Sequence, residues 1–230
     1  MVRSLAARAN YLALDRPDIA FATKELCRAF ASPNQQSFLA LKRLGRYLTG
    51  ARRMVWQFRF QPSTDILVTS VDTDFAGCLS TRRSTSGGVS QRGTHLLKHW
   101  SSTQTTVTLS SAEAELNGIC RGASTGLGLQ TMAKDLGFSW ALQIQTDATA
   151  AVRICRRRGL GRIRHLATAD LWVQDLLRSG GFTLNKLPGT ENTSDTLTKH
   201  IVKLTLCKHL VSLGLMFEDG RASLAPKIDA

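Results

Sequence analysis

Four acidic residues stand where a folded chain brings neighbouring segments together. Asp72 and Asp147 each follow a short run of β-branched and apolar residues that predicts a strand. Glu115 lies near the start of a predicted long helix, and Asp195 opens a predicted later helix. Sites in α/β sheets form beyond the ends of strands, at points where the chain directions diverge. We therefore expect these carboxylates to form one cluster.

A cluster of carboxylates points to a divalent metal centre. Phosphodiester cleavage by two metal ions, roughly 3.5–4 Å apart, needs hard oxygen ligands, and Mg²⁺ accepts them with Mn²⁺ as a close substitute. Each acid has an ordinary alternative on its own, because strand-end aspartates cap turns and first-turn glutamates suit the helix dipole. The joint pattern carries the prediction.

The charge of the chain predicts a polyanionic partner. Its formal net charge is +13 and its pI is about 10.2. Lys and Arg side chains placed on phosphates release condensed counterions, although a basic, solvated surface would give the same composition. We predict that the nucleic-acid contacts are Arg82, Arg83, Arg156, Arg157, Arg158, Arg162, Arg164 and His165.

Hydrophobic periodicity divides the chain into a helical start and an α/β remainder. Residues 1–60 predict a small helical segment, residues 61–200 an α/β domain, and residues 201–230 a helix and a tail. From residue 64 onward the expected order is three strands, a helix, a strand, two helices, a strand and a helix. Ser110 and Glu113 form a capping box at the start of the long helix.

Six segments resemble, in order, the C-terminal part of the Pol polyprotein of copia-type LTR retrotransposons. They are YLA with RPDIAFA at 11–13 and 16–22, LKRLGRYLTG at 41–50, DTDFAG at 72–77, RSTSGG at 83–88, LSSAEAE at 109–115 and SDTLTK at 194–199. The resemblance implies a ribonuclease H-like domain with a mixed five-stranded sheet flanked by helices. The helical segment before it resembles the thumb and connection region of a reverse transcriptase.

The resemblance also implies an activity and a ligand set. The family's ribonuclease H domain is a metal-dependent endonuclease that cuts the RNA strand of RNA–DNA hybrids, using two Mg²⁺ ions. Its metal-binding, catalytic carboxylates correspond to Asp72, Glu115, Asp147 and Asp195, so that Glu115 rather than Glu113 is the ligand. The expected partners are an RNA–DNA hybrid and the rest of a reverse transcriptase or Pol polyprotein.

Departures from the family pattern bear on the rate of the reaction. Phe75 replaces a Trp, His200 replaces a Pro, and the turn at 188–190 has no His of the kind that assists product release in cellular ribonucleases H. Two alternatives stay open. One is a catalytically inactive retroelement remnant that binds nucleic acid or a partner; the other is a DNA-cutting relative of the same fold, against which the 109–115 motif argues.

The sequence predicts no contact with membranes. It holds no apolar run of the length of a membrane span, and its N-terminus lacks the apolar stretch of a secretory signal. Its five cysteines are widely spaced, which favours reduced thiols over a disulfide framework. We expect an intracellular protein, in the cytoplasm or the nucleus.

Overall fold

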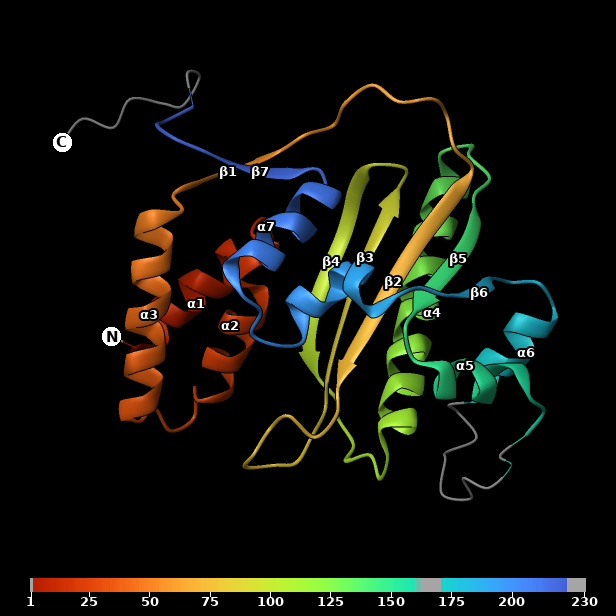
Figure 1. The fold of residues 1–230 in the computed structure, drawn as a ribbon, viewed down its shortest axis with the longest axis horizontal. Coiled ribbons are helices and arrows are strands. Elements are labelled where there is room, and N and C mark those ends of the chain that lie inside the picture. The colour runs from red at the N-terminus through yellow and green to blue at the C-terminus, as the bar shows by residue number, and fades with distance from the viewer. Residues whose placement is uncertain (1, 160, 162–170, 223–230) are drawn as a thin grey trace.

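The computed structural model describes residues 2–159, 161 and 171–222. A five-stranded mixed sheet in the order β4-β3-β2-β5-β6 forms its centre (Figure 1). β2, β3 and β4 are antiparallel neighbours, whereas β5 and β6 run parallel to β2. The strands are β2 (Ile66–Asp74), β3 (Thr85–Arg92), β4 (His95–Thr103), β5 (Ala141–Thr146) and β6 (Thr183–Lys186).

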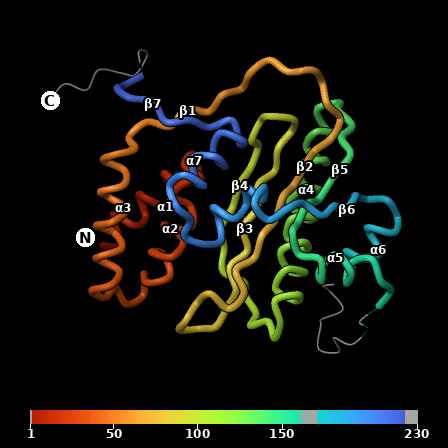
Figure 2. Tube along the Cα trace, in the orientation of Figure 1, coloured from red at the N-terminus to blue at the C-terminus, as the bar shows by residue number. Residues whose placement is uncertain are grey.

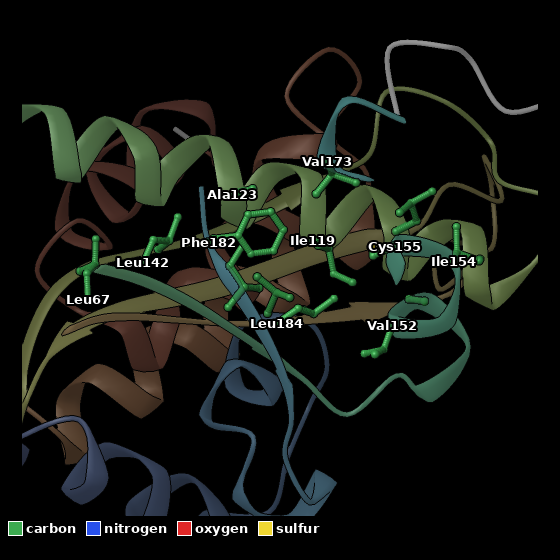
Figure 3. Close-up of a cluster of buried hydrophobic side chains, with 14 of the residues drawn as sticks. Leu67, Ile119, Ala123, Leu142, Val152, Ile154, Cys155, Val173, Phe182 and Leu184 are labelled. Carbon is green, nitrogen blue, oxygen red and sulfur yellow. The ribbon is translucent and has the colours of Figure 1, made fainter. Parts of the chain in front are cut away.

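Three helices cover one face of this sheet. The long helix α4 (Ser111–Asp135) lies along β2, and α5 (Thr149–Arg156) and α6 (Trp172–Arg178) pack beside it. Buried side chains from the helices and strands form one apolar core between them. Figure 3 shows this core, which includes Leu67, Ile119, Leu142, Val173 and Phe182.

A second core covers the other side of the sheet and joins the two ends of the chain. It contains residues of α1 (Val2–Leu12), α2 (Pro17–Arg28), α3 (Gln35–Gly50) and α7 (Lys203–Ser212), packed with Val89 of β3 and Leu96 of β4. The short strands β1 (Arg53–Trp56) and β7 (Leu215–Glu218) pair antiparallel, so the orange and blue segments lie side by side (Figure 2). The helical start therefore packs on the sheet together with the C-terminal helix.

The predicted fold class, a mixed five-stranded α/β sheet flanked by helices and preceded by a helical segment, is confirmed. The division at residues 60 and 200 stays a prediction. The prediction that an α-helix begins at Asp195 is wrong. Asp195 lies in the short 3-10 helix η3 (Thr193–Leu197), which follows the 3-10 helix η2 (Gly189–Glu191), and the next α-helix begins only at Lys203. In the described part of the chain, no helix is long and apolar enough to cross a membrane.

A stripe of glycines lets α4 lie close to β2. A Cβ atom at Gly118 would come within 2.7 Å of the Thr73 hydroxyl, and one at Gly122 within 2.6 Å of a Val71 methyl. These glycines are four residues apart, so they share one helix face. Gly128 on the same helix meets nothing within 4 Å. The close approach brings the N-terminal turns of α4 against the end of β2, where the predicted metal ligands lie.

This packing predicts opposite effects for two glycine substitutions in α4. Gly122→Leu should lower the free energy of unfolding by roughly 2–3 kcal/mol, because the added side chain overpacks the contact with Val71. Gly128→Ala should raise it by about 0.5–1 kcal/mol, because it gains helix propensity in open space. Chemical denaturation of both variants measures these changes, and a destabilisation of similar size at both positions would contradict the packing explanation.

Candidate metal centre

Asp72 lies near the end of β2, the central strand of the sheet. Its side chain is almost fully buried, and the Thr198 hydroxyl, which follows η3, donates a hydrogen bond to its carboxylate. Burial raises the pKa of Asp72, and the charge of Asp195 adds to that effect, while the hydrogen bond from Thr198 opposes it. The segment that follows η3 therefore holds the Asp72 carboxylate in place.

The start of α4 separates the roles of its two glutamates. The Ser110 side chain accepts a hydrogen bond from the Glu113 backbone N–H, and the Glu113 carboxylate accepts one from the Leu109 backbone N–H at 2.8 Å. Glu113 thus reaches back beyond the helix start, one residue further than the capping box predicts. Glu115, two positions on, faces the acidic cluster instead.

The Glu115 carboxylate is the most strongly perturbed acid of the centre. Burial, followed by the charges of Asp72 and Asp147, raises its pKa to about 9. In the described structure, its Oε2 atom is buried without a hydrogen-bond partner. A buried oxygen in this state is costly unless a proton or a cation compensates it.

Asp147 follows β5, which pairs parallel with β2, so the two strands deliver Asp147 and Asp72 to the same end of the sheet. One ligand oxygen each from Asp72, Glu115 and Asp147 lie within 4.8 Å of one another. Burial raises the pKa of Asp147, and the Asp72 charge raises it further. A Cβ atom at Gly189 would lie 3.0 Å from an Asp147 carboxylate oxygen, so η2 closes over this side of the centre.

Asp195 approaches the cluster from η3 but lies outside this group of three. Its Oδ1 atom is 3.0 Å from the Lys199 Nζ atom, which is also 3.9 Å from Asp72 Oδ2. Burial would lower the pKa of Lys199, but the Asp72 charge and the hydrogen bond to Asp195 outweigh it and raise that pKa. The structure therefore brings three of the predicted ligands together and places the fourth, Asp195, beside Asp72, where the Lys199 ammonium group forms ion pairs with both acids.

The donor set fits a hard divalent cation. Carboxylate oxygens are the ligands that Mg²⁺ and Mn²⁺ accept, and three acids this close repel one another unless protons or cations neutralise them. Burial and this repulsion raise the pKa values of Asp72, Glu115 and Asp147. The buried Glu115 oxygen without a partner is one that a cation would satisfy.

The predicted nucleic-acid contacts divide into two places. Arg82 and Arg83 are exposed in the loop between β2 and β3, where Arg82 adopts a positive φ of 55°. Arg156 and Arg158 are exposed at the end of α5, Arg157 is half-buried, and Arg156 donates a hydrogen bond to the Leu184 carbonyl on β6. Both places lie at the end of the sheet where β2 terminates (Figure 1). Arg162, Arg164 and His165 lie outside the described residues.

Sequence reasoning gave no role to three residues that shape the centre. Asn192 donates a hydrogen bond to the Val71 carbonyl at 3.1 Å and caps η3 through Ser194, so it fixes η3 to the central strand. Thr198 and Lys199 bind Asp72 directly. The spacing of four residues between Asp195 and Lys199 was a usable signal, because it places their side chains together in a helical turn.

The chain is similar in sequence to Pol polyproteins of plant retrotransposons. It is 26% identical over 216 residues to the "Retrovirus-related Pol polyprotein from transposon RE1" of Arabidopsis thaliana, covering 93% of this chain and 15% of that protein. It is 27% identical over 202 residues to the Pol polyprotein from transposon TNT 1-94 of Nicotiana tabacum, covering 86% of this chain and 15% of that protein. The chain thus spans about 15% of the length of these relatives. No protein-family model matches it.

The chain is also similar to a shorter protein in sequence and to two solved structures in fold. The secreted RxLR effector protein 161 of Plasmopara viticola is 36% identical over 104 residues, covering 45% of this chain and 72% of that protein. LC11-RNase H1, isolated from compost, is 14% identical and covers 59% of this chain and 94% of its own, with a TM-score of 0.47. The protease-reverse transcriptase of prototype foamy virus is 12% identical and covers 67% of this chain and 21% of its own, with a TM-score of 0.41.

The raised pKa of Glu115 predicts a pH-dependent loss of stability in metal-free protein. Its pKa in the folded state, about 9, lies above the ordinary value of 4.5, so the folded state holds a proton that the unfolded chain releases. This stability is fully present below the ordinary pKa of 4.5 and is lost as the pH rises through the folded pKa of about 9. In EDTA, Glu115→Gln should therefore lose less stability than the parent between pH 5 and pH 8.

Thermal unfolding at both pH values measures the effect. A change of about 1 kcal/mol moves the Tm of a domain of this size by about 2–4 °C. Glu191→Gln is the matched control, because Glu191 is exposed on η2. If Glu115→Gln follows the parent and this control at both pH values, the Glu115 carboxyl is not protonated in the folded state.

Proposed function

We propose that this chain is the ribonuclease H region of a retrotransposon Pol polyprotein. On that premise, it is a metal-dependent endonuclease that cleaves the RNA strand of RNA–DNA hybrids. The observation that carries the proposal is the group of Asp72, Glu115 and Asp147, with ligand oxygens within 4.8 Å of one another at one end of the sheet. The motifs at 72–77, 83–88 and 109–115 favour an element of the copia type.

Asp72, Glu115 and Asp147 are the residues that would hold the metal ions, with Asp195 completing the set from η3. Two Mg²⁺ ions, or Mn²⁺ in their place, would supply an activated water and stabilise charge on the leaving oxygen. The chain itself supplies the placement. β2 and β5 fix Asp72 and Asp147, α4 presents Glu115, and the Thr198 hydroxyl restrains the Asp72 carboxylate.

The arginines beside the centre would bind the hybrid through its backbone. Arg82 and Arg83 stand on the loop after β2, and Arg158 stands at the end of α5. Phosphate contacts position a duplex without reading its sequence, and the 2′-hydroxyl groups distinguish the RNA strand. The proposed substrate is therefore a hybrid of any sequence, with the rest of the Pol polyprotein as the proposed covalent or assembled partner.

Cleavage of a labelled RNA–DNA hybrid tests the proposed reaction. The parent chain should release RNA fragments in Mg²⁺ or Mn²⁺ and none in EDTA, and Asp72→Asn should reduce the rate by a factor of about 10³ or more, since an amide binds a hard cation poorly. Glu191→Gln should cleave like the parent. The duplex DNA of the same sequence should stay intact.

The outcomes separate the alternatives. Hybrid binding without metal-dependent cleavage would favour the inactive, nucleic-acid-binding remnant, and cleavage of duplex DNA would favour the DNA-cutting relative. Cleavage that survives Asp72→Asn would show that the ligand assignment is wrong. None of these results depends on turnover, so the test works at one equivalent of enzyme even if product release is slow.

Salt dependence tests the arginine contacts. If six or more phosphates are neutralised, hybrid affinity should fall about 10³-fold or more between 50 and 200 mM salt. Replacing both Arg82 and Arg83 by Ala should weaken binding and reduce the log–log salt slope by roughly 1–2. Fluorescence anisotropy with the Asp72→Asn background measures both quantities without cleavage. Arg8→Ala, an exposed position on α1, should leave the slope unchanged.

A further inference from the structure

Lys199 occupies an unusual place for a lysine. Its Nζ atom lies 3.0 Å from Asp195 Oδ1 and 3.9 Å from Asp72 Oδ2. The two acids are largely buried, with side chains 17% and 6% exposed, while the Lys199 side chain is 46% exposed. The ammonium group therefore enters the acidic centre from its open side on a flexible stem.

The position follows from the local backbone. The Lys199 backbone N–H donates a hydrogen bond to the Asp195 carbonyl, and the preceding Thr198 hydroxyl donates one to Asp72. Asn192 anchors the same segment to the Val71 carbonyl of β2. Three contacts thus fix the backbone of this segment beside the carboxylates, and the ion pairs of the Lys199 ammonium group are made at the end of a half-exposed side chain.

The ion pairs of Lys199 with Asp72 and Asp195 differ from an ordinary surface salt bridge. Exposed ion pairs contribute little, because water screens them. Here the Lys199 ammonium group faces the acids near the end of β2, and its charge lowers the pKa values of Asp72, Glu115 and Asp147 against the burial that raises them. The Lys199 charge thus offsets part of the repulsion among the carboxylates, as a bound cation would.

We propose that Lys199 is a built-in counter-ion of the metal centre: its ammonium group holds Asp72 and Asp195 together in the metal-free chain and leaves that position when divalent cations bind. The inference rests on the proposed metal site. The exposed stem permits the departure, because Lys carries a compact charge on four rotatable methylenes. The lysine thereby keeps the centre folded before metal arrives and sets the cation concentration that is needed to load it.

Two measurements on Lys199→Met test this role without measuring catalysis. In EDTA, the variant should unfold about 3 °C or more below the parent, because the carboxylates repel without their counter-ion. In saturating Mg²⁺ that gap should close. Mn²⁺ binding, followed by titration calorimetry, should become about tenfold tighter in the variant, because the cation no longer competes with the ammonium group.

Two control variants define the charge effect. Lys199→Arg keeps the charge and should bind Mn²⁺ within about threefold of the parent, with a Tm in EDTA close to that of the parent. Lys208→Met removes a positive charge from an exposed position on α7 and should change neither quantity. Lys199→Gln provides a second neutral variant if Lys199→Met does not fold.

The failure of this inference can be told from the failure of the proposed function. A parent that binds Mn²⁺, together with Lys199→Met binding it equally or more weakly, overturns the counter-ion role and leaves the metal site intact. A Tm gap that is the same in EDTA and in Mg²⁺ makes Lys199 a plain structural contact and overturns it as well. A parent that does not bind Mn²⁺ overturns the proposed metal site itself.

Discussion

Repulsion among the carboxylates at the end of β2 is the constraint around which the rest of the structure is arranged. Asp72, Glu115 and Asp147 bring their oxygens within 4.8 Å of one another in a largely buried place, where negative charge is expensive. An isolated sheet would not hold such a group together. The two cores, one on each face, supply the rigidity that keeps these acids in place despite their charge.

Each layer contributes a different part of that restraint. On one face, the glycines of α4 permit a close approach to β2, which brings Glu115 to the strand end that carries Asp72. On the other face, Asn192 just before η3 and Thr198 and Lys199 just after it contact the same strand. In the second core, η3 packs against α2 and α7. The N-terminal helices therefore stabilise the segment whose residues contact Asp72.

The sequence was a good guide to elements whose side chains alternate or recur with a clear period. The strands around Asp72 and Asp147 and the long helix after Ser110 lie where periodicity predicts them. It was a poor guide to the segment after Asp195, which forms a 3-10 helix, and to β7, whose pairing with β1 joins residues far apart in the chain. Strand pairing of this kind depends on a distant partner, which no local pattern contains.

What the sequence determined by itself is therefore the chemistry: which acids end strands, which glutamate caps the helix, and which motifs resemble those of Pol polyproteins. Only the tertiary structure decided how those groups meet. It placed Asp195 outside the group of three, paired Lys199 with both Asp195 and Asp72, and left a Glu115 oxygen buried without a partner. The physical reason is that residue type and spacing are local properties. Electrostatic energy, in contrast, depends on distances between segments that meet only when the chain folds.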